Sequence, residues 1–408
     1  MSKQHDRLER IEHRHNQLLM ANKTASELAA IAGGTPCYIY DRKALIDRVK
    51  RLRAQMPADL QLHYAIKANP MPAVVDLMAT LVDGLDVASH KEMRVALGAG
   101  ISAQQISFAG PAKSMEELKA ATVAGIIVNV ESGLELSRLY QCFDELQKKP
   151  RIAFRVNPDF ELKASGMKMA GGPKQFGIDA EQIPDVLKAL DLSKVDFQGF
   201  HIFSGSQNLK PESLIDSHKK TFELATRLAE LAPVDVRHIN IGGGLGIPYF
   251  PGEKALNIAL VANNLRILME QRPPILKRTA IVMELGRYLV GEAGYYLCQV
   301  TDKKVSRGQV FLMTNGGLHH HLANSGNFGQ VIRKNYPVVL ANRLKAEKTE
   351  SVEIVGPLCT PLDIVGAKLD LPPAEVGDYI AVLQSGAYGA TASPQAFLGH
   401  PEVRELLL

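Results

Sequence analysis

LHYAIKANPMPAVVDLMATLVDGLDVAS, residues 62–89, contains an apolar strand, a segment with helical spacing and a second apolar strand. The same alternation continues to about residue 285 and gives eight candidate strands, at residues 62–66, 84–89, 105–110, 125–130, 151–156, 197–203, 237–244 and 280–285. Strands that are apolar throughout and are separated by helices indicate a parallel sheet covered by helices. Eight such units predict an α/β fold with a (β/α)8 TIM barrel, although a doubly wound open sheet would give a similar alternation.

The sequence on either side of this region predicts a second domain made of strands. After residue 285, short alternating or apolar runs with turns replace the helical spacing. Residues 33–41 also predict a strand, which we expect to join that sheet. The first 30 residues predict a helix with Leu8, Ile11, Leu18 and Leu19 on one side. The expected division is an N-terminal helix and strand at 1–42, the barrel at 43–286, and a C-terminal β-sandwich or barrel-like domain at 287–408.

Composition points to a partner that is a small or specific molecule. The chain has 408 residues, 46% of them hydrophobic, and a formal net charge of +4, which gives no general attraction to nucleic acid or membranes. Its charged N-terminus lacks the apolar run of a signal peptide, and we expect a cytoplasmic protein with no membrane span. The four cysteines, Cys37, Cys142, Cys298 and Cys359, are far apart, so neither a disulfide framework nor a zinc site is expected.

Residues with functional chemistry stand at the ends of the predicted strands, which meet at one face of a parallel barrel. They are Lys67, Asp86, Gly110, Asn157, His201, Gly242, Gly243, Gly244 and Glu284. Each alone has an ordinary explanation, such as a solvated lysine, a satisfied core histidine, a tight glycine turn or a Glu284–Arg287 salt bridge. Together they supply an amine, a phosphate cradle and a carboxylate that can keep a nitrogen protonated. These are the three requirements of pyridoxal 5′-phosphate.

The same residues lie in motifs that resemble a known family. In chain order the motifs are YAIKAN, DVAS, FHIFSGSQ, INIGGG, ELGR, GPLCTPLD and SGAYG, between Thr35 and Phe397. They resemble the fold-type III pyridoxal-phosphate decarboxylases, the group of diaminopimelate, ornithine and arginine decarboxylases. The resemblance implies an alanine-racemase-like barrel and a head-to-tail homodimer whose active sites are shared across the interface.

The resemblance also implies a role for individual residues. Lys67 would form a Schiff base with the cofactor, His201 would stack on its ring, and Glu284 would pair with the pyridine nitrogen. The other implied cofactor-binding residues are Asp86, Ser204, Gly242, Gly243, Gly244, Gly286, Arg287 and Tyr388. Cys359 would reach into the neighbouring subunit's site and return a proton after carbon dioxide leaves, and Asp363 is in the same loop. A buried structural thiol is the alternative interpretation of Cys359.

Two substrate-binding residues of the family are missing. Thr360 occupies the position directly after the cysteine where amino-acid-specific members have an acidic residue. The segment GGLHHHLANSGNF lacks the arginine that clamps the distal carboxylate in diaminopimelate decarboxylases, and no arginine follows until Arg333. We keep Cys359, Thr360, Asp363 and His320 as candidate substrate contacts. No metal is expected from His319, His320 and His321, because successive residues of a strand face opposite sides.

Other departures resemble one subgroup of the family. Phe203 replaces a glycine, and Leu285 replaces the proline of the usual EPGR motif. These features are similar to the glutamyl-carrier-protein and exosortase-associated decarboxylases, which implies an aminoacyl substrate tethered to an acyl carrier protein. The basic residues Arg333, Lys334, Arg343, Lys345 and Lys348 could dock such an acidic carrier, although a solvated face is the favoured interpretation of these residues.

The expected activity is therefore decarboxylation of the α-carboxylate of an amino acid or of a carrier-bound aminoacyl group. Three alternatives stay open: a diaminopimelate decarboxylase that makes lysine, an amino-acid racemase, and a non-catalytic homologue that binds the cofactor. A racemase would need a tyrosine base where this chain has the Cys359 loop. A non-catalytic homologue would be expected to lose Lys67 or the phosphate ligands, which are present here.

Overall fold

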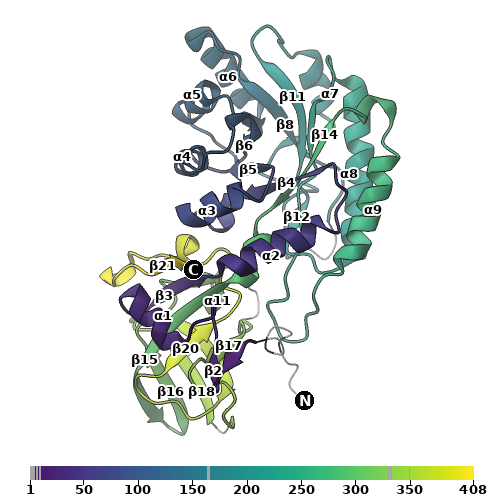
Figure 1. Cartoon of the computed structure of the whole chain (residues 1–408). Coiled ribbons are helices and arrows are strands. Elements are labelled where there is room, and N and C mark those ends of the chain that lie inside the picture. The colour runs from purple at the N-terminus through teal and green to yellow at the C-terminus, as the bar shows by residue number, and fades with distance from the viewer. Residues whose placement is uncertain are drawn as a thin grey trace. The chain divides into compact units, whose positions relative to one another are not determined.

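The barrel consists of eight parallel strands in one closed sheet (Figure 1). In order they are β4 (Leu60–Ala65), β5 (Gly84–Val87), β6 (Ile106–Phe108), β7 (Ile127–Val130), β8 (Arg151–Asn157), β11 (Asp196–Ile202), β13 (His238–Asn240) and β14 (Ala280–Leu285). β14 pairs in parallel with β4 and so closes the ring. The barrel prediction is confirmed, and each strand overlaps one of the eight predicted apolar runs. The computed structural model describes residues 5, 8, 11–162, 166–328, 330, 333–348 and 350–408.

The chain divides into two units. The barrel unit comprises residues 48–247 and 256–289, and the β unit comprises residues 1–47, 248–255 and 290–408. The helices are α1 (Ala25–Ala32), α2 (Arg42–Arg53), α3 (Pro72–Ala79), α4 (His90–Gly98), α5 (Met115–Ala124), α6 (Gly133–Leu146), α7 (Ile183–Lys188), α8 (Pro211–Leu231), α9 (Ile258–Glu270), α10 (Arg287–Val290) and α11 (Leu322–Ser325). Short strand pairs are β9 (Met167–Lys168) with β12 (Gly205–Ser206), and β10 (Ile178–Asp179) with β8.

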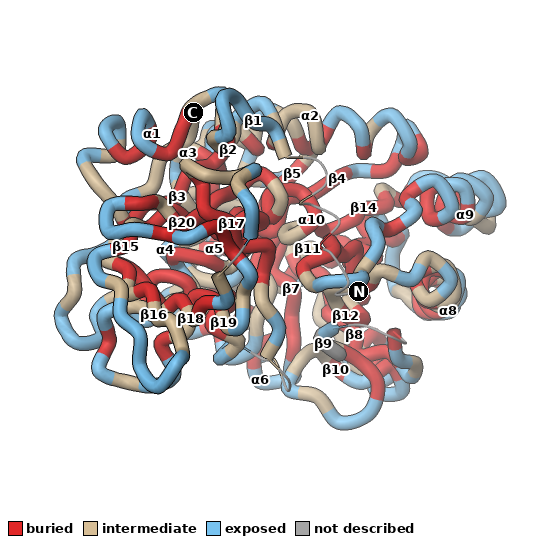
Figure 2. Tube along the Cα trace, turned by 90° about the horizontal axis from the view of Figure 1, so that it is seen from below, coloured by how far each residue is buried: buried red, intermediate tan, exposed pale blue. Residues whose placement is uncertain are grey.

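Local sequence fixes where several barrel helices begin. Ser89, Ser114 and Ser132 precede α4, α5 and α6, and each hydroxyl accepts a hydrogen bond from the backbone N–H three residues later. A glutamate occupies that third position in all three helices, which places its negative charge at the positive end of the helix. The barrel strands are largely buried, whereas the outer sides of α8 and α9 are exposed (Figure 2).

The β unit is built around a mixed sheet in the order β17-β20-β15-β16-β18-β19, with β3 added between β15 and β21. The strands are β3 (Cys37–Tyr40), β15 (Gly294–Ser306), β16 (Gln309–Thr314), β17 (Val338–Leu340), β18 (Glu350–Val355), β19 (Ile364–Leu371), β20 (Tyr379–Val382) and β21 (Arg404–Leu407). β3 lies in the strand predicted at residues 33–41 and pairs antiparallel with β15. Its Cys37 and Ile39 are fully buried in the apolar core of the unit.

The predicted N-terminal helix is wrong for residues 11–20. Here the chain forms a hairpin of β1 (His13–Arg14) and β2 (Gln17–Leu18). Its turn residues His15 and Asn16 have φ of 48° and 65°, the conformation of tight hairpin turns. Helix α1 begins only after Thr24, whose side chain and that of Glu27 form a capping box. Residues 1–4, 6–7 and 9–10 of the predicted helix lie outside the described residues.

Among the described residues, no helix combines the length and apolar character needed to cross a bilayer.

Candidate active site

Lys67, His201 and Glu284 come together in the barrel unit. Lys67 lies in a short 3-10 turn (Ile66–Ala68) directly after β4, and its Nζ is 3.5 Å from Oε1 of Glu284 on β14. Nε2 of His201, on β11, is 3.1 Å from the other carboxylate oxygen of Glu284. The Glu284 side chain is only 4% exposed, whereas that of Lys67 is 41% exposed. The amine is thus reachable from solvent, while the carboxylate is enclosed.

The Glu284 carboxyl keeps its negative charge in this environment. Burial by itself raises the pKa of a carboxyl, because the charged form loses its hydration. Here the Lys67 ammonium and the hydrogen bond and charge of His201 outweigh burial and hold the pKa of Glu284 well below its ordinary value. A buried, ionised carboxylate of this kind requires a cationic partner, and a protonated ring nitrogen would serve as one.

The glycine turn after β13 lies against Glu284. Gly242 and Gly244 have φ of 69° and 89°, which glycine adopts without strain. A Cβ atom added to Gly243 would overlap the carbonyl oxygen of Glu284, so this position has no room for a side chain. A side-chain-free turn lets backbone N–H groups approach an anion. The amine, the ionised carboxylate and this cradle fit a cofactor with an aldehyde, a basic ring nitrogen and a phosphate.

We predict that Gly243→Ala weakens binding of pyridoxal phosphate at least about ten-fold, because the added methyl group must push the turn away from Glu284. Absorbance or fluorescence titration of the cofactor-free protein measures the dissociation constant. Gly98→Ala is the matched control, since a Cβ there meets no atom within 4 Å. An unchanged dissociation constant for Gly243→Ala would contradict the proposed phosphate cradle.

Other candidates of the barrel unit follow the ends of the same strands, β11 and β14. Gly286 directly follows β14, and a Cβ added there would lie 3.0 Å from Cβ of Ala68 and 3.3 Å from the carbonyl oxygen of Ala65, next to the Lys67 turn. Ser204 follows β11, is 8% exposed and accepts a backbone hydrogen bond from Met169 through its carbonyl oxygen. Arg287 begins α10.

Asp86 belongs to a polar network inside the barrel that sequence reasoning missed. Its Oδ1 is 3.2 Å from Nδ1 of His63 and accepts a 2.5 Å hydrogen bond from the hydroxyl of Ser107. Asn129 in turn donates to the Ser107 hydroxyl. The four residues lie on the neighbouring strands β4, β5, β6 and β7, and each is at most 4% exposed. At least one oxygen of the candidate cofactor residue Asp86 is therefore bonded to protein groups.

Arg155 and Glu131 form a second buried cluster, which the sequence motifs did not predict. Arg155 on β8 donates to Glu131 at 2.9 Å, and Glu131 also accepts from the backbone N–H groups of Gly110 and Gly177. Glu131 thus joins segments that follow three different strands. Arg155 adds a smaller contribution to the low pKa of Glu284. The only sequence signal was a charged residue inside an apolar strand, RIAFRV.

Phe203, one of the predicted departures from the family, lies beside the central residues. Its ring centroid is 5.6 Å from Nζ of Lys67, and its ring meets that of His201 edge-on with centroids 6.2 Å apart. The aromatic ring therefore occupies space next to the amine that a glycine would leave open.

Within the β unit, the candidate residues differ in access. Cys359 lies in the turn between β18 and β19 and is exposed, whereas the other three cysteines are buried. Its neighbour Thr360 and Tyr388, which has a φ of 53°, are half-buried. His320 is 1% exposed, and its Nε2 is 2.8 Å from the carbonyl oxygen of Pro401. Asp363 is 2% exposed and accepts hydrogen bonds from two backbone N–H groups.

The expectation that the three histidines lie on a strand is wrong. They form a turn that leads into α11, and Nδ1 of His321 accepts a hydrogen bond from the N–H of Asn324. Burial lowers the pKa of His319 to about 4 and that of His321 to about 3, so both are neutral near pH 7. Across the described ranges, no group of three or more His, Cys, Asp or Glu residues is placed to hold a metal ion.

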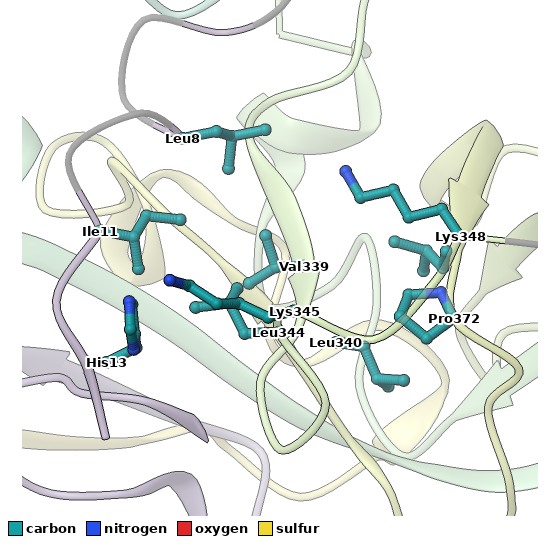
Figure 3. Close-up of a pocket in the computed structure, with 10 residues that line it drawn as sticks. Leu8, Ile11, His13, Val339, Leu340, Leu344, Lys345, Lys348 and Pro372 are labelled. Atoms are coloured by element: carbon teal, nitrogen blue, oxygen red, sulfur yellow. The ribbon is translucent and has the colours of Figure 1, made fainter. Parts of the chain in front are cut away.

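The residues of the predicted basic stretch have different contacts. Arg343 is 3.5 Å from both Glu375 and Asp378, and Nζ of Lys334 lies over the ring of Phe250. Lys345 and Lys348 instead border a cavity of about 230 Å³ (Figure 3). The other lining residues are Leu8, Ile11, His13, Val339, Leu340, Leu344, Leu371 and Pro372. We call this cavity the lysine-rimmed pocket, and its charged lining residues among those that the structure describes include Lys345 and Lys348 but no carboxylate.

Comparison with known proteins gives consistent matches. The family model for the pyridoxal-binding domain of pyridoxal-dependent decarboxylases matches residues 42–291. The chain is 37% identical to the L-glutamyl-[BtrI acyl-carrier protein] decarboxylase of Niallia circulans, over 91% of this chain and 88% of that protein. It is 31% identical to the diaminopimelate decarboxylase of Aquifex aeolicus, over 98% and 92% of the two chains. The crystal structure of diaminopimelate decarboxylase from M. jannaschii with L-lysine superposes with a TM-score of 0.86 at 26% identity, over 98% and 92% of the two chains.

Proposed function

The chain belongs to the pyridoxal-dependent decarboxylases, and from this premise we propose that it removes the α-carboxylate of an aminoacyl group carried on an acyl carrier protein. The observation that carries the chemistry is the cluster of Lys67, His201 and Glu284 beside the glycine turn. The relatives named above are decarboxylases, which favours this reaction over racemisation and over cofactor binding without catalysis.

Each residue has a proposed task. When bound, pyridoxal phosphate supplies an electron sink for the bond to the departing carboxylate. Lys67 would hold the cofactor covalently through Nζ, His201 would contact its ring, and Glu284 would keep a proton on its ring nitrogen. The phosphate ligands are proposed to be Ser204, Gly242, Gly243, Gly244, Arg287 and Tyr388, and Asp86 and Gly286 are further proposed cofactor-binding residues. Cys359 returns a proton to the α-carbon, and its exposure in the β unit is consistent with service to a second subunit of a cytoplasmic homodimer.

The proposal of a carrier-bound substrate rests on two features. The chain lacks the arginine and the acidic residue that family members use to bind the distal groups of free diamino acids, since it has His320 and Thr360 in those segments. The relative with 37% identity acts on a glutamyl group bound to a carrier protein. Diaminopimelate decarboxylation is the second candidate, because 31% identity to such an enzyme extends over nearly the whole chain.

Carbon dioxide release from a substrate panel tests the proposal. The panel contains free diaminopimelate, ornithine, lysine, arginine and glutamate, a glutamyl thioester, and glutamyl-loaded carrier protein. We expect turnover of the thioester and of the loaded carrier at rates at least about a hundred-fold above those of the free amino acids. Turnover of free diaminopimelate at the highest rate would replace this proposal with the second candidate.

The lysine-rimmed pocket is the proposed docking site of the carrier. Most of its described lining residues are apolar, and Lys345 and Lys348 add positive charge, so it complements an apolar side chain flanked by carboxylates on an acidic protein. Two exposed cations guide such a partner more strongly at low salt than at high salt, because ions screen exposed charges over about 10 Å at 0.1 M.

We predict that the double variant Lys345→Glu/Lys348→Glu binds the loaded carrier at least about ten-fold more weakly at low salt. Calorimetry or surface plasmon resonance at two salt concentrations measures this. Lys304→Glu/Arg307→Glu is the matched control, with the same charge change on exposed residues near the β15–β16 turn. Equal, salt-insensitive binding by both variants would exclude the pocket as the docking site.

A further inference from the structure

Asp363 has a different environment from that expected of a substrate contact. Its carboxylate is buried, with 2% of the residue exposed, at the base of the turn that joins β18 to β19. Oδ2 accepts a 2.8 Å hydrogen bond from the N–H of Leu358, the residue before Cys359. Oδ1 accepts a 2.6 Å hydrogen bond from the N–H of Leu318, the residue before His319. One side chain thus links residues 356–362, which we call the Cys359 turn, to residues 316–321, which we call the three-histidine turn.

Two glycines leave room for this carboxylate. A Cβ atom added to Gly317 or to Gly356 would overlap the carboxylate oxygens of Asp363. Gly317 precedes Leu318 in one turn, and Gly356 opens the other turn, where its N–H donates to the carbonyl oxygen of Asp363. Both turns therefore fold around Asp363, and a longer side chain at 363 would not fit between the two glycines.

We propose that Asp363 is a positioning residue that fixes the Cys359 turn against the three-histidine turn and so sets where the thiol is presented. Charge-assisted hydrogen bonds from backbone N–H groups are about twice as strong as neutral ones, and leaving such a buried donor unpaired is costly. The two turns are separated by about forty residues of sequence, and the carboxylate connects them directly. The effect of Asp363 on catalysis by the Cys359 thiol rests on the proposed function, whereas the link between the two turns does not depend on it.

Asp363→Asn tests the link without changing the size of the side chain. An amide has one acceptor oxygen, so its NH2 group must face one of the two backbone N–H donors. Hydrogen exchange measured by mass spectrometry on the cofactor-loaded protein follows residues 316–321 and 356–362. We expect exchange in both segments to accelerate at least about ten-fold, while other strands of the β unit keep wild-type rates.

Thiol alkylation supplies a second readout that does not require substrate. Cys359 is the exposed cysteine, whereas Cys37, Cys142 and Cys298 are buried. Burial also raises the pKa of Cys37 and of Cys298 to about 12, so a thiol reagent reports on Cys359. We expect the alkylation rate of Asp363→Asn to depart at least about three-fold from wild type. We also expect kcat for carbon dioxide release to fall at least about ten-fold with an unchanged cofactor spectrum, because Asp363 is not proposed to touch the cofactor.

Matched variants keep the proposal open to refutation. Asp370→Asn changes an exposed carboxylate on β19 and should behave as wild type in each measurement. Gly356→Ala displaces the Asp363 carboxylate without removing its charge and should reproduce the Asp363→Asn exchange pattern. If Asp363→Asn does not fold, the exchange pattern of Gly356→Ala alone tests the link between the turns. The positioning role would be refuted if a folded variant kept the wild-type exchange rate in either turn. It would also be refuted if Asp363→Asn and Gly356→Ala both accelerated exchange throughout the β unit. If exchange and alkylation change as expected in the variants but the wild-type protein turns over no panel substrate, the proposed function is refuted while the link between the turns stands.

Discussion

Lys67→Ala is expected to abolish the visible absorbance band of bound cofactor and to lower carbon dioxide release on the order of 10³-fold or more. The amine is the group of the site that can bond covalently to an aldehyde, and it is reachable because its side chain is 41% exposed. Without it, the cofactor would be held only by noncovalent contacts at the glycine turn and beside Glu284. Spectra of purified protein with added cofactor and single-substrate turnover measure the two effects.

Two comparisons make this result interpretable. Lys91→Ala removes an exposed lysine from α4 of the same unit and should retain both the band and turnover. Thermal unfolding of the Lys67→Ala protein should show that the barrel is intact. Wild-type turnover by a folded Lys67→Ala protein would refute the assignment of Lys67 as the covalent residue.

The barrel could be predicted from the sequence because its strands are buried on both sides. Runs such as AIVMEL and GIIVNV are apolar nearly throughout, and each overlaps a strand of the closed sheet. The meeting of Lys67, His201 and Glu284 followed from the same physics, since the ends of parallel strands converge at one face. The three residues lie far apart in sequence, and the barrel brings Nζ of Lys67 to 3.5 Å and Nε2 of His201 to 3.1 Å from the Glu284 carboxylate.

Features that depend on tertiary partners could not be predicted. Nothing local in the sequence indicates that Asp86 meets His63 and Ser107, because those partners lie on other strands. The N-terminal hairpin was mistaken for a helix because its apolar residues also fit helical spacing, and the left-handed turn at His15 and Asn16 decided the outcome. Likewise, the role of Asp363 depends on two backbone N–H groups from separate turns.

Glu284→Gln is expected to lower kcat about 10²- to 10³-fold while the Lys67 linkage and its absorbance band remain. Glutamine keeps the size and position of the side chain, but it carries no charge to hold a proton on the ring nitrogen. It also removes the negative partner of Lys67 and His201. Rapid-mixing measurements of carbon dioxide release at saturating substrate separate this effect on kcat from changes in KM.

The pH dependence distinguishes a charge effect from a general loss of structure. Because the pKa of Glu284 is held below its ordinary value of 4.5, this carboxylate stabilises the folded state above pH 4.5, and the contribution is lost as pH falls toward the lower, folded-state pKa. The stability difference between wild type and Glu284→Gln should therefore be largest near neutral pH and shrink below pH 4.5, as followed by denaturant unfolding at several pH values. Glu230→Gln, an exposed change on α8, should show no such difference. A Glu284→Gln enzyme with wild-type kcat from pH 6 to 8 would show that the buried charge is not used in the reaction, and the proposed task of Glu284 would have to be given up.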